Sequence, residues 1–179
     1  MKKKVFSVVV IMFLFISSFS QDWVKDDSDN FSLKGVVDAD SLLADKIFDI
    51  SRMWFAETFN DADEVIDYEN KKNHTLIGNG IISVFHSSGL ANLKLYVKFK
   101  VKIQAKDNKY RYCIDNIYYN GVPISTYYGY QYKNNGTKRT GNIYTCYGET
   151  IEKTRIELCN LMESLNNEIV NSNIDDNDW

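Results

Sequence analysis

The chain has 179 residues and a nearly balanced charge, with 21 Lys or Arg against 24 Asp or Glu. This length suits one domain with a substantial hydrophobic core. Pro123 is the only proline, which excludes a proline-rich linker to a second module.

The first twenty residues have the organisation of a secretory signal peptide. Three lysines precede an apolar run over residues 5–19, and Ser18 and Ser20 supply the small residues of a cleavage site before Gln21. The run is too short to span a bilayer, which argues against a retained anchor. No cysteine lies near the cut, so we expect no lipid anchor. The sequence predicts an exported protein, periplasmic or extracellular, that loses residues 1–20.

The two ends of the mature chain are acidic. Seven of the 24 acidic residues lie within residues 22–29 and 175–178. Acidic ends of this kind are typical of disordered, solubilising tails. We therefore predict an acidic leader and an acidic tail around one folded part, with these boundaries: leader 21–30, single domain 31–171, tail 172–179.

The clearest structural signal lies at residues 93–119. Apolar residues occupy the odd positions from 93 to 105, and mostly lysines occupy the even positions. This period of two predicts a strand with one buried and one exposed face. Asp107 and Asn108 suit a two-residue hairpin turn, because both tolerate positive φ.

A turn at these two residues sets the register of the hairpin. The pairs expected on one face are Ala105 with Tyr110, Ile103 with Tyr112 and Val101 with Ile114. Those expected on the other are Gln104 with Arg111, Lys102 with Cys113 and Lys100 with Asp115. The large apolar residues of both strands then fall mainly on one face, so we predict one sheet with one dry face. Lys100 and Asp115 are expected to form a weak ion pair.

Further strands and two amphipathic helices surround this hairpin. The predicted strands cover residues 31–37, 64–69 and 74–85, a link covers 86–92, and the helices cover 41–59 and 149–171. The residues of the first helix expected to face the sheet are Leu43, Ile47, Ile50 and Trp54. Those of the second are Ile151, Leu158, Cys159, Met162, Leu165 and Ile169. Gly78 and Gly80 indicate a bend or close packing against a helix.

This order of elements predicts an α+β fold. Successive strands with short links form an antiparallel sheet, and two amphipathic helices can cover only one of its faces. We expect a two-layer domain with a mainly antiparallel sheet, two helices on one face and the other face open.

Several motifs point to a known family. They are Trp54 in the first helix, the strand at Val65-Ile66, the segment 77–80 and the hairpin 106–111. In this combination, over about residues 31–119, the sequence resembles a family of exported Bacteroidota proteins of unknown function with a TATA-binding-protein-like fold. The resemblance implies the fold and the export, and it implies no active site. The segment 120–148 departs from the family pattern.

The three cysteines of the mature chain are Cys113, Cys146 and Cys159. An exported chain can form disulfides, and an odd count leaves one thiol over. A Cys113–Cys146 bridge is our preferred hypothesis, with three reduced cysteines as the alternative.

Signatures of metal binding and catalysis are missing from the sequence. His74 and His86 lie at opposite ends of one predicted strand and no Cys-x-x-Cys occurs, so we expect no metal site and no cofactor. We find no register that places either histidine beside Cys113 or Cys146 to activate a nucleophile. Carboxylates that meet only in space stay open. We expect no enzyme, with a small hydrolase as an alternative.

A row of basic residues, the lysine stripe, follows the exposed face of the hairpin. It comprises Lys94, Lys98, Lys100 and Lys102, extended around the turn by Lys106, Lys109 and Arg111. The simplest interpretation is a solvated strand face. Alternatively, the stripe and Tyr96 bind an anionic partner, such as an acidic glycan, a lipid head group or an acidic protein patch. Nucleic acid, which the TATA-binding protein holds on this face, is not expected for an exported chain.

Eight of the twelve tyrosines lie between Tyr118 and Tyr147. Asn134-Asn135-Gly136 separates two strand-like runs in this segment and predicts an extra β-ribbon. Tyrosine provides broad contact area at low entropic cost. A ribbon with one face exposed would form a binding edge through Tyr127, Tyr128, Tyr130 and Tyr132, and otherwise it only covers the sheet.

Taken together, the sequence predicts an exported, non-enzymatic binding module with an envelope or extracellular partner, either a protein or an anionic glycan. A structural component of the cell envelope without a free ligand is the first alternative.

Overall fold

The structure, a computed structural model, describes residues 21–25, 30–59, 65–88, 91–131 and 137–175. The predicted signal peptide and the predicted turn at Asn134-Asn135-Gly136 lie outside these residues.

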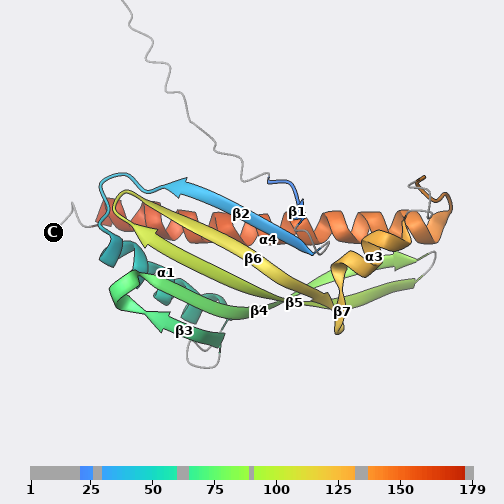
Figure 1. Cartoon of the computed structure of the whole chain (residues 1–179), viewed down its shortest axis with the longest axis horizontal. Helices are drawn as coiled ribbons and strands as arrows, with labels where there is room; N and C mark the ends of the chain where they lie inside the picture. The colour runs from blue at the N-terminus through green and yellow to red at the C-terminus, as the bar shows by residue number, and fades with distance from the viewer. Residues whose placement is uncertain (1–20, 26–29, 60–64, 89–90, 132–136, 176–179) are drawn as a thin grey trace, which may run out of the picture.

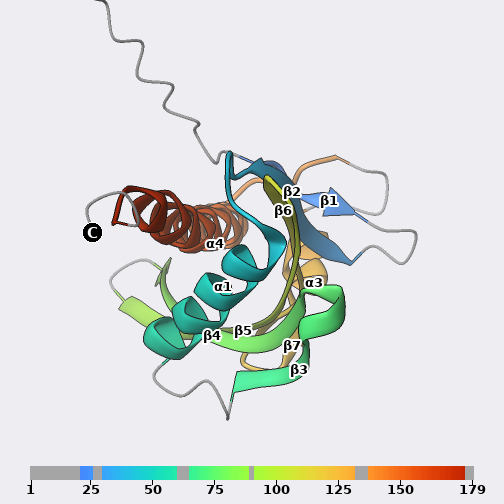
Figure 2. The same ribbon diagram turned by 90° about the vertical axis from the view of Figure 1, so that its left-hand side faces the viewer.

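The described chain forms one sheet and three α-helices (Figure 1). In chain order the elements are β1 (Val24–Lys25), β2 (Phe31–Asp38), α1 (Ala44–Phe59), β3 (Ile66–Asn70), the 3-10 turn η1 (Lys71–Asn73), β4 (Thr75–Ser88), β5 (Ala91–Lys106), β6 (Lys109–Tyr119), β7 (Val122–Pro123), α3 (Ile124–Tyr130) and α4 (Asn142–Asp175). The seven strands pair antiparallel in the order β1-β2-β6-β5-β4-β3, with β7 beside β6. Helices α1 and α4 lie together on one side of the sheet, as Figure 2 shows. The predicted α+β architecture is confirmed.

The register of the central hairpin is also as predicted. Ala105, Ile103 and Val101 pair with Tyr110, Tyr112 and Ile114, and Lys100, Lys102 and Gln104 pair with Asp115, Cys113 and Arg111. Asn108 adopts the expected positive φ of 64°. The turn also holds α1, because Asp107 Oδ1 accepts a hydrogen bond from the backbone N–H of Ala44 at 2.9 Å. This bond satisfies one of the free donors at the start of the helix.

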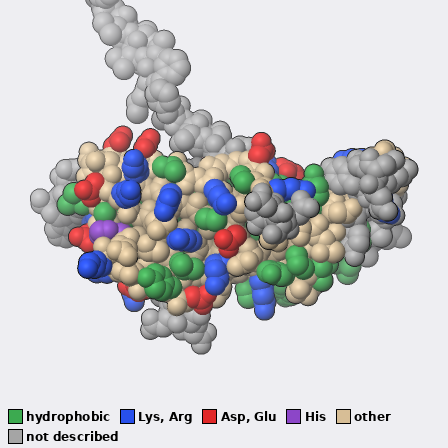
Figure 3. All heavy atoms as spheres, viewed as in Figure 1, with side chains coloured by type: hydrophobic (Ala, Val, Ile, Leu, Met, Phe, Trp, Pro, Cys, Tyr) green, Lys and Arg blue, Asp and Glu red, His purple; other side chains and the backbone are tan. Residues whose placement is uncertain are grey.

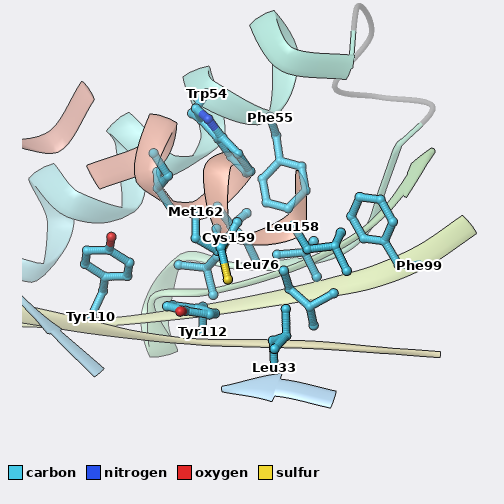
Figure 4. Close-up of a cluster of buried hydrophobic side chains, with 14 of the residues drawn as sticks. Leu33, Trp54, Phe55, Leu76, Phe99, Tyr110, Tyr112, Leu158, Cys159 and Met162 are labelled. Carbon is cyan, nitrogen blue, oxygen red and sulfur yellow. The ribbon is translucent and has the colours of Figure 1, made fainter. Parts of the chain in front are cut away.

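The core lies between the two helices and the inner face of the sheet (Figure 4). The indole Nε1 of Trp54 donates to Ser164 Oγ at 2.9 Å and so connects α1 to α4. Leu43 was expected to face the sheet, and this is wrong: its side chain is 67% exposed, whereas Leu42 is buried. The reason is that α1 begins only at Ala44, so Leu43 lies before the helical periodicity starts.

Close packing of β4 against the core requires glycine at two positions. A Cβ on Gly80 would lie 2.4 Å from Phe99 Cζ, and a Cβ on Gly78 would lie 2.7 Å from Phe55 Cε1. Both distances are too short for carbon atoms in contact. The prediction of close approach at these glycines is confirmed.

The expected link at residues 86–92 is wrong, because β4 and β5 continue through most of it. The two strands continue beyond the end of β6. We call their distal part, residues 81–88 of β4 and 91–98 of β5, the arm (Figure 1). The segment stays in strand conformation because α4 supplies partners for its inner face. His86 Nδ1 lies 2.7 Å from Thr150 Oγ1, and the His86 ring stacks on Tyr147.

The predicted tyrosine ribbon is wrong as well. Residues 124–130 form α3, and α4 begins already at Asn142. Tertiary packing overrides the strand propensity of tyrosine here. Tyr127 contacts Tyr119, and Tyr128 contacts Phe31, with ring centroids 5.1 and 4.9 Å apart.

Residues 21–25 belong to the folded domain, although they were expected in a disordered leader. Val24 and Lys25 of β1 pair with Ser32 and Phe31 of β2. Arg155 of α4 donates from Nη1 to the carbonyl oxygen of Gln21 at 2.8 Å. These contacts anchor residues 21–25 to both layers.

The structure does not form the hypothetical Cys113–Cys146 bridge. All three cysteines are free thiols. Cys113 lies on the sheet face opposite the helices, whereas Cys146 belongs to α4, so the sheet separates the two sulfur atoms. A disulfide requires Cα atoms within about 7 Å of each other.

Candidate functional site: the open face of the sheet

No described helix covers the second face of the sheet, which we call the open face; Figures 1 and 3 view it directly. The alternation of β5 directs the predicted lysine stripe to this face. Lys94 and Lys98 are exposed, while Lys100 and Lys102 are partly buried. Figure 3 shows basic side chains distributed over the central strands. The structure therefore places the stripe where the sequence predicts it.

A hollow of about 700 Å³ lies on the open face where β2, β6 and β5 run side by side. Its lining comprises Gln21, Lys34, Gly35, Val36, Lys102, Gln104, Arg111, Tyr112, Cys113 and Asp115. The strand register arranges two rows across it. Lys34, Cys113 and Lys102 form one row, and Val36, Arg111 and Gln104 form the next. Two lysines therefore flank Cys113, with a guanidinium in the adjacent row.

The guanidinium of Arg111 is held by hydrogen bonds that cross three strands. Its Nε donates to Gln104 Oε1 at 2.9 Å, and Gln104 Nε2 donates to Thr75 Oγ1 at 3.2 Å. The Thr75 hydroxyl in turn donates to the carbonyl oxygen of Asn73 at 3.0 Å. This chain of hydrogen bonds fixes Arg111 from its Nε side. Its two terminal nitrogens form no hydrogen bond with the described residues and can donate to a ligand.

The cations that line the hollow share it with one carboxylate, that of Asp115. Among the described residues, Lys34, Lys102 and Arg111 form no ion pair, whereas Lys100 binds Asp67 Oδ2 at 2.9 Å. The predicted pairing of Lys100 with Asp115 is therefore wrong: the two are register neighbours, but Asp67 on β3 captures the ammonium. This hydrogen bond lowers the pKa of Asp67. Asp67 neutralises Lys100, whereas no described carboxylate forms an ion pair with the three cations of the hollow.

Cys113 lies at the floor of the hollow as a protonated thiol. Burial raises the pKa of this thiol, and the neighbouring carboxylate of Asp115 raises it further. The sulfur donates to Asp115 Oδ2 at 3.6 Å. A nucleophilic cysteine needs a lowered pKa. The geometry therefore favours binding rather than covalent chemistry at this position.

The structure separates the predicted tyrosine contacts from the lysines. Tyr127 and Tyr128 of α3 are half-buried in packing contacts, and Lys25 Nζ lies 4.3 Å from the ring centre of Tyr128. Only the backbone of Tyr130 is described, and Tyr132 lies outside the described residues. Tyr96 alone joins the stripe, with Lys94 Nζ 5.5 Å from its ring centre.

Sequence reasoning missed Lys34 and Val36 as residues of the hollow. They belong to β2, which pairs with β6 although the two strands are far apart in the chain. Alternation along β2 would assign Leu33 to the inner face and Lys34 and Val36 to the outer face. Gly35 interrupts this alternation because it has no side chain. No local signal identifies the partner strand.

Within the described residues, no group of three or more His, Cys, Asp or Glu side chains is placed to hold a metal ion. None of the described helices is both long and apolar enough to cross a membrane.

An antiparallel sheet with helices on one face and an open second face defines the class of TBP-like folds. A family model, "Domain of unknown function (DUF4468) with TBP-like fold", matches residues 34–120. The matched part of the chain includes the central hairpin and most of the hollow. The family resemblance found in the sequence is confirmed.

Two solved structures share the fold. A DUF4468 family protein from Bacteroides ovatus is 12% identical, with a TM-score of 0.62, and the match covers 80% of this chain and 89% of that chain. A TBP-like protein from Parabacteroides distasonis is 15% identical, with a TM-score of 0.58, over 78% of this chain and 92% of that chain. No curated protein matches the chain.

Proposed function

We propose that this protein is an exported, non-enzymatic binding module whose open face contacts an anionic partner. The observation that carries the proposal is the group of three cations around the hollow, Lys34, Lys102 and Arg111, which form no ion pair with the described residues. Unpaired cations in one depression attract anions and strengthen their hydrogen bonds. The tethered Arg111 adds a positioned fork for a carboxylate or sulfate.

The size of the hollow favours a sugar-sized acidic unit over a bare ion. Its volume of about 700 Å³ lies within the range of roughly 300–1,000 Å³ typical of small-molecule sites. Val36, which is 67% exposed, offers an apolar contact beside the guanidinium. An acidic glycan combines these requirements, because it presents apolar ring faces together with carboxylate or sulfate groups.

The test is titration calorimetry of the chain without residues 1–20. The probes are oligogalacturonate and a sulfated oligosaccharide, with a neutral malto-oligosaccharide as control. We expect binding of an acidic probe and none of the neutral one. Arg111→Gln and Lys102→Gln should each weaken binding by about tenfold or more, as expected for a lost hydrogen bond between charged groups.

Lys100→Gln is the matched control, because it removes the same charge from the same face two residues away from Lys102. Since Asp67 already neutralises Lys100, this variant should bind nearly as tightly as the parent. Parent-like affinity of the Arg111 and Lys102 variants, or equal losses in all three, would contradict a specific site.

Capture from envelope fractions separates this proposal from a purely structural role. The parent chain and the Arg111→Gln variant are immobilised side by side, with thermal melting to show that both are folded. A component retained by the parent and released by free acidic oligosaccharide supports a binding module. A fixed partner that both variants retain, and that oligosaccharide does not displace, supports an envelope component instead.

A further inference from the structure

A second surface lies at the other end of the open face, on the arm formed by β4 and β5. The register places Ile81 opposite Lys98, Ser83 opposite Tyr96 and Phe85 opposite Lys94. Ile81 and Phe85 are each 56% exposed, and Tyr96 is 53% exposed. Figure 3 shows hydrophobic side chains on this part of the face. Three protruding apolar side chains therefore surround Ser83, with a lysine at each end.

The charge of this hairpin is one-sided. From Thr75 to Lys106 the sequence contains five lysines and no Asp or Glu. Lys100 is paired with Asp67, but Lys94 and Lys98 form no ion pair with the described residues. The apolar side chains of the arm thus lie between unneutralised cations.

This chemistry discriminates between possible occupants. A second copy would bring lysines against lysines, which is unfavourable. A protein partner would need pockets matched to Ile81, Phe85 and Tyr96 together with acidic residues placed opposite the lysines. A lipid surface needs no pocket, because its acyl chains adapt to apolar side chains while its head groups meet the cations.

We propose that the arm docks on an anionic lipid surface, with Ile81, Phe85 and Tyr96 at the level of the head groups and Lys94 and Lys98 on lipid phosphates. The combination of an apolar cluster with flanking lysines and no acidic residue is the feature typical of interfacial binding. This docking is independent of the hollow and does not require an acidic glycan there.

The inner face of the arm keeps the docking residues in place. His86 contacts Thr150 of α4, and Lys153 Nζ donates to the carbonyl oxygen of Phe85 at 3.4 Å. Because the outer side chains of Ile81 and Phe85 take no part in these contacts, substitutions there leave the arm folded.

The test is co-sedimentation of the chain without residues 1–20, whose apolar run would itself bind lipid. Vesicles of phosphatidylcholine with phosphatidylglycerol are compared with vesicles of pure phosphatidylcholine. We expect binding to the anionic vesicles only. The double variants Ile81→Ser/Phe85→Ser and Lys94→Gln/Lys98→Gln should each lower the partition coefficient about tenfold or more.

Two control variants make the outcome decisive. Leu43→Ser removes an even more exposed apolar side chain elsewhere and should bind as the parent does. Arg111→Gln impairs the hollow and should also retain vesicle binding. Lack of parent binding, or equal binding by the arm variants, would overturn the proposal. Two other results would also overturn it if the parent does not bind vesicles. One is self-association in sedimentation equilibrium that the arm variants abolish, and the other is capture of an acidic protein that the arm variants abolish.

Discussion

The two faces of β5 differ in how completely their groups are partnered. Val97, Phe99 and Val101 on the inner face are at most 2% exposed and pack under the helices. Lys98 and Lys102 on the outer face alternate with them and have no acidic partner among the described residues. One strand thus has an inner face that is fully packed and an outer face whose charged groups can still bind another molecule. Stability comes from the first, and any contact with another molecule is expected at the second.

Two polar groups on the inner side and one on the outer side illustrate the difference, although the buried hydroxyl of Tyr110 on the inner side has no hydrogen-bond partner among the described residues. On the inner side, the Tyr119 hydroxyl lies 2.7 Å from Thr154 Oγ1, and Trp54 donates to Ser164. Such bonds offset the cost of burying polar groups. On the outer side, Arg111 is positioned by Gln104 but retains free donors. Substitutions on the inner face should therefore affect folding, and substitutions on the outer face should affect binding.

The largest effect on stability is expected from alkaline pH, through the buried tyrosines of the inner face. Burial raises the pKa of Tyr110, Tyr112 and Tyr119 well above the unfolded value of about 10. Above this pH the unfolded chain loses these protons while the folded chain keeps them, so stability falls as pH rises. Each tyrosine contributes a decrease of about 1.4 kcal/mol per pH unit.

Urea unfolding at increasing alkaline pH measures this decrease. In Tyr119→Phe the free energy of unfolding should fall less steeply with pH, by the contribution of one proton. An unchanged slope in Tyr119→Phe would show that this tyrosine ionises in the folded protein.

Truncation of the inner face of α1 should have the next largest effect. Ile47 is fully buried, so Ile47→Ala should lower the free energy of unfolding by about 3 kcal/mol. Leu43→Ala, in the same part of the chain but 67% exposed, should change it by less than about 0.5 kcal/mol. Denaturant melts of both variants test whether Ile47 belongs to the core and Leu43 does not. Similar losses would contradict the structure.

Loss of the contact between the hairpin turn and α1 should be of intermediate size. Asp107→Ala removes the acceptor for the backbone N–H of Ala44 and should cost about 1 kcal/mol. Asp107→Asn keeps an oxygen acceptor and should recover most of this loss. If the asparagine variant is as unstable as the alanine variant, charge rather than the hydrogen bond is responsible. Thermal or urea unfolding gives the comparison.

The smallest effect is expected for the outer ion pair. Lys100→Met removes the partner of Asp67, and stability should change by less than about 1 kcal/mol, as for other exposed pairs. The pKa of Asp67, lowered by Lys100, should rise towards its ordinary value. The small stabilisation is present above the unfolded pKa and is lost as pH falls, so the variant and the parent should converge in acid. Carboxyl chemical shifts measured by NMR report the pKa directly.

The family and the central hairpin could be predicted because their signals are local. A strand with alternating polarity and a turn of two residues with the right backbone preferences determine a register without any information from the rest of the chain. The predicted register of the hairpin ends at Asn116, whose φ is 51°. The register shifts at this point, and burial moves from the even residues of β6 to Ile117 and Tyr119. Nothing in the local pattern requires this bulge.

The sequence by itself determined the amphipathic elements, the open sheet and the lysine stripe, since these depend on periodicity along short segments. The tertiary structure alone decided which strands become neighbours. Pairing of β2 with β6 brings Lys34 to Lys102 and Arg111, and β3 brings Asp67 to Lys100. It also turned the tyrosine-rich segment into helices, because Phe31 and Tyr119 provide packing partners for Tyr127 and Tyr128. Contacts between residues far apart in the chain depend on the packing of the whole domain, which local propensity does not encode.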